Sequence, residues 1–213
     1  TRYTVIALDL RGHGASDKPH DPAAYGTAFV DDVVRLLDHL NIRRAHTVGY
    51  SMGSAITLKL LSTPPDRVIS AVLGGFGWRA PGLGPPEGVV QIRAQVERAA
   101  RGDTTLAELL AASEAIDFPP QVRAAINSND LIALQAVQAG DGALHTVTEA
   151  TLRSNAIPVL AVVGELDWAR PDVEQMVAVT SNSTIEIIPG ATHVSAFAHP
   201  LFLEAVVRFL AAH

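Results

Sequence analysis

The chain has 213 residues, a length typical of one α/β domain with a modest insertion. Hydrophobic residues make up 48% and charged residues 18%, which is too apolar for a disordered chain, and the absence of cysteine excludes a disulfide scaffold, a thiolate metal site and a cysteine nucleophile. The formal net charge is −6 and no basic cluster stands out, so we expect no nucleic-acid partner.

Five short apolar segments predict strands, at 3–8, 45–50, 68–74, 157–163 and 184–188. Each is nearly continuous in apolar residues, as expected of strands buried on both faces of a parallel sheet. Helical patterns lie between them. One places Phe29, Val33 and Leu37 on a single face with Thr27 as its N-cap, and the last begins at Pro200. The alternation predicts an α/β fold with a mainly parallel sheet.

The alternation stops between the third and fourth of these strands. Residues 74–88 contain six glycines and three prolines, a composition typical of a hinge-like loop. Helical patterns follow near 87–101, 105–114, 119–127, 129–139 and 143–153. We therefore expect a core formed by 1–75 and 151–213, with 76–150 inserted as a helical cap.

The strongest chemical pattern is Gly49-Tyr50-Ser51-Met52-Gly53, a G-x-S-x-G between a predicted strand and a predicted helix. A serine on so sharp a turn has strained backbone angles, so the residues two before and two after it are expected to be small. Such a turn presents the serine hydroxyl above the carboxyl end of the sheet. The alternative interpretation is an ordinary glycine turn.

A serine hydroxyl becomes an effective nucleophile only beside a base that an acid orients. Asp167 lies just past a predicted strand end, with Glu165 as a rival closer to the strand. His193 follows the last strand on a predicted loop, and of the eight histidines it alone also completes the chain order serine, acid, histidine. We predict that Ser51, His193 and Asp167 lie within hydrogen-bonding distance of one another.

With these residues in this order, the chain resembles the α/β-hydrolases, in the esterase and haloperoxidase lineage. Residues 9–16, Asp-Leu-Arg-Gly-His-Gly-Ala-Ser, are similar to that family's D-x-R-G-x-G-x-S loop, in which Gly12 and Gly14 are expected to have positive φ and the acid and arginine to brace the turn. The resemblance covers nearly the whole chain. It implies a serine–aspartate–histidine triad, a backbone oxyanion donor at the Met52 N–H, and a cap at 76–150.

One departure from the family concerns its first three strands and the H-G loop after the third, which have no counterpart here. The segment 3–8 would match the fourth strand and 45–50 the fifth, although the third lies between them in the family. We therefore expect 3–8 to pair directly with 45–50 or to be completed by a second molecule at the exposed sheet edge. The missing loop supplies one of two oxyanion donors, and losing one costs about 10²–10³ in rate. The chain is then a fragment, or a protein that has lost or rebuilt part of its site.

The leading hypothesis is a serine hydrolase that cleaves a small carboxylic ester through an acyl-enzyme, with no cofactor and no metal. The family's dehalogenases and epoxide hydrolases have an aspartate where this chain has Ser51. The alternatives are a cofactor-free perhydrolase with the same triad, and a non-catalytic or inactive protein without a complete oxyanion hole. Phe76 and Trp78 either form the acyl-pocket wall or pack the cap on the core, and Val194, after the histidine, is a third candidate contact.

The longest apolar stretches, 68–78 and 157–164, are far too short to span a membrane. No leader pattern opens the sequence. We therefore expect a soluble, cytoplasmic protein whose partner is a small-molecule ester and not a membrane.

Overall fold

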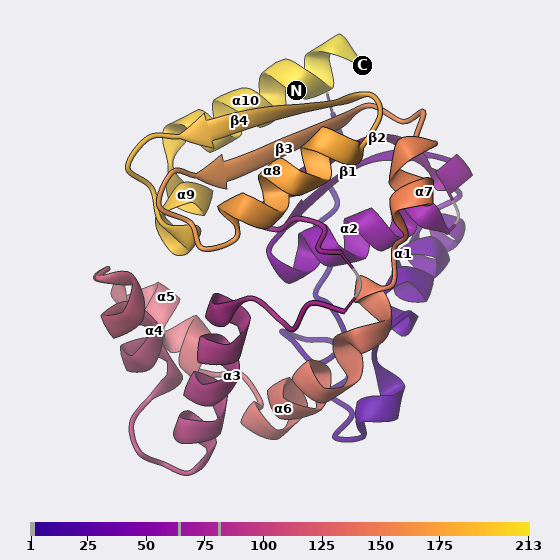
Figure 1. Ribbon diagram of the computed structural model, residues 1–213. Coiled ribbons are helices and arrows are strands. Elements are labelled where there is room, and N and C mark those ends of the chain that lie inside the picture. The colour runs from indigo at the N-terminus through magenta and orange to yellow at the C-terminus, as the bar shows by residue number, and fades with distance from the viewer. Residues whose placement is uncertain (1–2, 64, 81) are drawn as a thin grey trace.

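The computed structural model describes residues 3–63, 65–80 and 82–213 (Figure 1). Within them, a parallel four-stranded sheet has the order β1-β2-β3-β4. Its strands are β1 (Ala45–Tyr50), β2 (Val68–Gly74), β3 (Val159–Gly164) and β4 (Ser183–Ile188). The four later segments predicted as strands are therefore confirmed, and the expected α/β fold class with them.

Helices flank the sheet and fill the long connection between β2 and β3. The flanking helices are α1 (Ala28–His39), α2 (Met52–Ser62), α8 (Arg170–Val179), α9 (His193–Ala198) and α10 (Pro200–Ala212). The connection holds α3 (Glu87–Ala100), α4 (Leu106–Glu114), α5 (Pro120–Asn127), α6 (Leu131–Gly140) and α7 (Glu149–Arg153). The predicted helix at 143–153 is split, because Thr148 caps a new helix by accepting the Thr151 N–H.

The two central strands are buried on both faces. Leu73 and Val163 pack into a cluster with residues of α1, α2 and α8, whereas their neighbours Val72 and Val162 pack with α10. In Figure 1, α8 and α10 accordingly lie on opposite faces of the sheet. Burial of both faces explains why these strands are continuous apolar runs in the sequence.

The helical insertion (residues 76–150) has a small hydrophobic cluster of its own. Val96 and Ala99 of α3 pack there against Leu106 and Leu109 of α4. Figure 1 shows α4 and α5 beneath the arrowheads that mark the carboxyl ends of β3 and β4. The insertion therefore lies over the edge of the sheet where the functional loops of α/β proteins gather.

The first predicted strand, at 3–8, is wrong. These residues follow an irregular path, and among the described residues β1 pairs only with β2, so the expected direct pairing of 3–8 with 45–50 is wrong too. Val5 is 85% exposed, while the Tyr3 hydroxyl donates to the Leu210 carbonyl at 2.7 Å. An apolar β-rich sequence forms a strand only where a neighbour supplies the other half of the hydrogen-bond ladder.

The loop after this segment agrees with its predicted glycine conformations. The φ angle is 83° at Gly12 and 52° at Gly14. A Cβ at Gly14 would lie 2.3 Å from the carboxyl group of Asp9, so glycine is required there. Arg11 forms hydrogen bonds with both carboxylate oxygens of Asp32 at 2.6 and 2.7 Å, which raises the pKa of Arg11 and ties the loop to α1.

Candidate active site

Ser51 occupies the sharp turn between β1 and α2. Its φ of 52° and ψ of −117° lie outside the regions that non-glycine residues usually adopt. The Ser51 N–H donates to the Gly74 carbonyl at the end of β2, at 2.7 Å, and this bond helps to hold the strained turn. Met52 begins α2, so its N–H belongs to the first helical turn, where it has no acceptor within the helix.

Only one of the two glycines around this turn is required for steric reasons. A Cβ at Gly49 would lie 2.2 Å from the carbonyl oxygen of Gly53. A Cβ at Gly53 would meet no described atom within 4 Å outside its own helix. The expectation that both residues must be small is therefore correct for Gly49 and wrong for Gly53.

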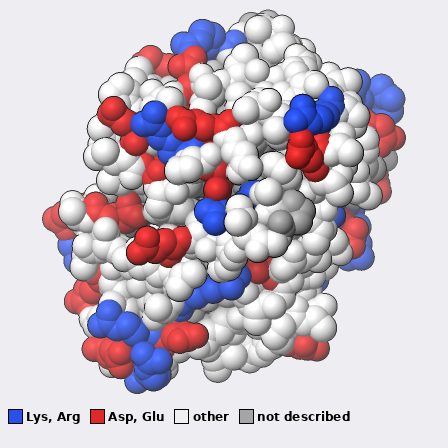
Figure 2. All heavy atoms as spheres, viewed as in Figure 1, with Lys and Arg blue, Asp and Glu red and all other residues white. Residues whose placement is uncertain are grey.

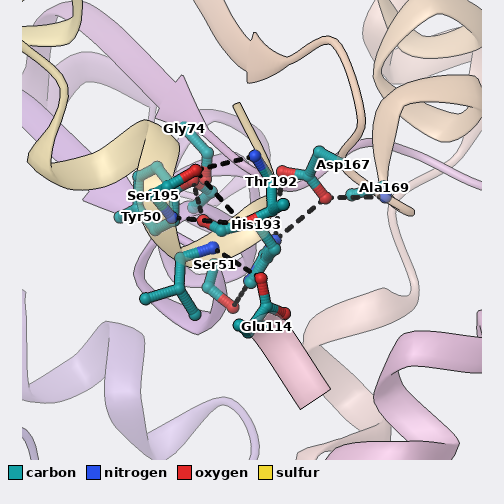
Figure 3. A network of polar contacts seen from close by, with 11 residues as sticks. Tyr50, Ser51, Gly74, Glu114, Asp167, Ala169, Thr192, His193 and Ser195 are labelled. Atoms are coloured by element: carbon teal, nitrogen blue, oxygen red, sulfur yellow. Dashed lines mark hydrogen bonds and ion pairs between the residues drawn. The ribbon is translucent and has the colours of Figure 1, made fainter. Parts of the chain in front are cut away.

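Ser51, His193 and Asp167 form a hydrogen-bonded series (Figure 3). The Ser51 Oγ lies 3.0 Å from His193 Nε2, and His193 Nδ1 lies 3.0 and 3.1 Å from the two carboxylate oxygens of Asp167. The Asp167 side chain is fully buried and also accepts the Ala169 N–H at 2.8 Å. The predicted proximity of the three side chains is thus present.

His193 is the first residue of the short helix α9 and does not lie on the loop where we expected it. Thr192 caps that helix, since its hydroxyl accepts the Ser195 N–H while its own N–H donates to the Ser195 hydroxyl. The Tyr50 hydroxyl donates to the His193 carbonyl. Burial, reinforced by nearby acidic charges, raises the pKa of Tyr50 and keeps this hydroxyl protonated as a donor.

Trp168 also contacts His193, and the sequence analysis did not single it out. The two ring centroids are 4.5 Å apart with the planes tilted by 30°. A Cβ at Gly88 of α3 would lie 2.2 Å from the indole, so Trp168 is packed between the histidine and the helical insertion. Its place directly after Asp167 was the only indication available in the sequence.

Two further carboxylates lie near the site without contacting the histidine ring. Glu165 accepts the Gly190 N–H at 2.8 Å and so braces the turn that precedes His193. Glu114, at the end of α4, accepts the Val194 N–H at 3.3 Å (Figure 3). No sequence pattern indicated Glu114, because its contact depends on how the insertion packs on α9.

A cavity of about 330 Å³ lies between the insertion and the core. Phe76, Trp78 and Trp168 are among the residues that line it, whereas Ser51 and Val194 are not. Trp78 is also buried and donates from Nε1 to the Val147 carbonyl at 2.7 Å. Trp78 therefore packs the insertion on the core and lines this cavity, and its role as the wall of an acyl pocket stays a prediction.

Neither a metal site nor a membrane-spanning helix is present in the described part of the chain. In the described ranges, no group of three or more histidine, aspartate and glutamate side chains is arranged to hold a metal ion. No helix in the same ranges is long and apolar enough to cross a membrane. On the face shown in Figure 2, acidic and basic residues are mixed in small groups.

The family model described as alpha/beta hydrolase fold matches residues 1–200. The chain belongs to this family. An uncharacterized protein of Mycobacterium bovis is 31% identical over 241 residues, which covers 98% of this chain and 68% of that protein. A hydrolase from Pseudomonas aeruginosa PA01, whose crystal structure has been solved, is 29% identical in sequence. The match covers 94% of this α/β-hydrolase chain and 77% of the other chain, with a TM-score of 0.72.

A shorter match concerns the dihydrolipoyllysine-residue acetyltransferase component of the acetoin cleaving system of Cupriavidus necator. It is 40% identical over 101 residues, 45% of this chain. The chain spans only about a quarter of that protein's length, with 26% covered. The family membership and the hydrolase among the relatives support hydrolytic chemistry.

Proposed function

We propose that this α/β-hydrolase is a serine hydrolase that cleaves a small carboxylic ester through an acyl-enzyme. The observation that carries the proposal is the series of hydrogen bonds from Ser51 through His193 to Asp167, near 3.0 Å at each step. Each residue follows a strand end, in the chain order typical of this family.

In the first half-reaction, Ser51 Oγ attacks the ester carbonyl carbon while His193 Nε2 takes the hydroxyl proton. Asp167 accepts the Nδ1–H, which leaves Nε2 free as the base and stabilises the imidazolium that forms. The imidazolium returns the proton to the leaving oxygen as the carbon–oxygen bond breaks. The alcohol departs, and the acyl group stays on Ser51. Water then attacks the acyl carbon and gives a proton to Nε2. The imidazolium passes this proton to Ser51 Oγ as the acyl–oxygen bond breaks, which releases the acid and restores the serine.

The negative charge on the carbonyl oxygen needs hydrogen-bond donors during both attacks. The Met52 N–H, at the positive end of α2, supplies one of them. Since the loss of one donor costs about 10²–10³ in rate, we expect activated aryl esters to be better substrates than alkyl esters.

In this proposal the helical insertion is a cap on a core formed by 1–75 and 151–213. Two contacts support this assignment, the hydrogen bond from Val194 to Glu114 and the packing of Trp168 against Gly88. Both contacts involve residues directly beside the triad. The cap thereby limits the access of water to His193.

The test is the hydrolysis of 4-nitrophenyl acetate by the wild type and by Ser51→Ala. We expect kcat to fall by about 10⁴-fold or more, with His193→Ala equally severe and the double variant little worse, because the residues act as a unit. Ser62→Ala, at the far end of α2, is the control and should remain active. Hydrolysis that persists in Ser51→Ala contradicts the proposal, and a wild type inactive on every ester favours the non-catalytic alternative.

A further inference from the structure

The cavity between the helical insertion and the core shares a wall with the proposed catalytic residues. Trp168 lines the cavity and stacks on His193 with ring centroids 4.5 Å apart. Phe76, another wall residue, comes two residues after Gly74, whose carbonyl accepts the Ser51 N–H. The volume of about 330 Å³ falls at the lower end of the range for small-molecule pockets. The cavity therefore lies next to the proposed catalytic residues, with Trp168 as the wall that it shares with His193.

Most of the cavity wall is apolar. Leu58, Leu83, Val89 and Leu144 contribute aliphatic surface, and Phe76 and Trp168 contribute aromatic surface. Such a wall favours an aliphatic or aromatic group, which loses unfavourable contact with water when it enters.

Two arginines interrupt this apolar wall, and each retains hydrogen-bonding capacity. Arg79 donates from Nε to Asp172 at 3.0 Å and from Nη1 to a backbone carbonyl at 3.2 Å. Arg93 uses Nη2 alone, 3.1 and 3.3 Å from the carboxylate oxygens of Asp141. Its Nε is buried and has no hydrogen-bond partner among the described residues. A guanidinium has five N–H donors, so each of these groups can take a second acceptor.

The arginines are more accessible than the aspartates they pair with. The side chains of Arg79 and Arg93 are 33% and 36% exposed, against 10% for Asp172 and 17% for Asp141. The ring of His145, whose Nε2 lies 3.7 Å from Asp141, adds a further polar group to the same wall. A ligand that enters the cavity therefore meets hydrogen-bond donors more readily than carboxylates.

We propose that the cavity binds the part of the substrate remote from the scissile bond, and that this part is an apolar or aromatic group that ends in a carboxylate. Arg93 binds the carboxylate, and the apolar wall binds the rest. The connection to Ser51 rests on the proposed ester hydrolysis. The substrate class is then a small ester that carries a second, free carboxylate.

Tryptophan fluorescence can report binding in this cavity without turnover. Both tryptophans of the chain, Trp78 and Trp168, line it. The Ser51→Ala variant is titrated with 3-phenylpropanoate and with 3-phenylpropanamide, which has the same shape and no charge. We expect the acid to bind about tenfold or more tightly than the amide, because hydrogen bonds to charged groups are the stronger ones. Equal binding, or tighter binding of the amide, overturns the proposal.

Variants of Arg93 test whether its guanidinium causes the tighter binding of the acid. In the same background, Arg93→Gln should remove the preference for the acid and leave the amide affinity unchanged. This change leaves Asp141 without its partner. The double variant Arg93→Gln Asp141→Asn replaces the charged pair by a neutral one, and it should show the same loss of preference as Arg93→Gln. Arg101→Gln is the matched control, since Arg101 lies at the end of the same helix and does not line the cavity. A preference for the acid that survives both Arg93 variants contradicts the proposal.

Rates of ester hydrolysis distinguish the proposed carboxylate site from the proposed serine hydrolase activity. The substrates are a 4-nitrophenyl monoester of an aliphatic dicarboxylic acid and the same compound with its free carboxylate methylated. We expect about tenfold higher kcat/KM for the free acid in the wild type, and no difference in Arg93→Gln. If both are hydrolysed equally well, the proposed substrate class is wrong and the serine hydrolase stands. If neither is hydrolysed through Ser51, the proposed function fails, and the titration alone decides what the cavity binds.

Discussion

Two carboxylates follow β3, and their surroundings assign them different roles. Asp167 is fully buried, and both of its oxygens lie within 3.1 Å of His193 Nδ1. Glu165 accepts the backbone N–H of Gly190, in the turn that leads to the histidine. We infer that Asp167 orients the base and that Glu165 shapes the loop.

Replacing each carboxylate by its amide tests this assignment. Asp167→Asn should lower kcat on an aryl ester by about 10⁴-fold, because an amide at this position stabilises the wrong histidine tautomer. Glu165→Gln keeps an acceptor for the Gly190 N–H and should retain most of the activity. Steady-state kinetics measure both variants, with circular dichroism as the check on folding. A larger loss in Glu165→Gln would reverse the two roles.

Residues whose place follows from a strand end were predictable, and residues whose contacts depend on the insertion were not. Ser51, Asp167 and His193 each come shortly after a segment that the sequence predicts as a strand, so their convergence at one end of the sheet followed from the parallel topology. Glu114 reaches the Val194 N–H through the way α4 packs on the core, and Trp168 packs against Gly88 of α3. No local pattern encodes that packing.

Gly49 and Gly53, two residues before and after Ser51, provide a matched pair of substitutions in the turn between β1 and α2. Gly49→Ala drives a Cβ toward a backbone oxygen 2.2 Å away, so we expect a loss in unfolding free energy of about 3 kcal/mol, as in severe overpacking. Gly53→Ala enters open space at the start of α2 and should leave stability unchanged or raise it by up to about 1 kcal/mol. Urea unfolding measures both. Equal losses in the two variants would mean that the turn is not packed as described.

The strands show where local sequence suffices and where it does not. The apolar patterns at β2 and β3 correctly predicted strands. These segments form strands because each pairs with neighbouring strands and is covered on both faces. The segment 3–8 is as apolar, yet it has no ladder partner within the described ranges and leaves Val5 largely exposed. A segment forms a strand only when a second segment pairs with it, so the sequence of 3–8 alone could not show whether it forms one.

At the scale of the whole molecule, β1 leaves one edge of the sheet without a partner strand among the described residues. Val48 in this edge strand is 49% exposed, and the buried Thr47 hydroxyl has no hydrogen-bond partner in the described structure. An edge strand with an unpaired ladder favours pairing with another chain. We propose that a second copy of this chain covers it.

Light scattering coupled to size-exclusion chromatography tests this association. The wild type should shift from monomer to dimer as its concentration rises, and Val48→Lys should remain monomeric because a lysine opposes edge-to-edge pairing. Val90→Lys is the control, since Val90 is similarly exposed, at 51%, but lies on α3 of the insertion. A wild type that is monomeric at every concentration would exclude the second copy.

Covalent labelling tests whether Ser51 is a nucleophile that His193 activates. The protein is incubated with a fluorophosphonate, and its intact mass and peptide masses are measured. We expect one phosphonyl adduct per chain on the peptide that contains Ser51, no adduct in Ser51→Ala, and strongly slowed labelling in His193→Ala. A folded protein that gains no adduct, or an adduct on a different serine, would contradict it.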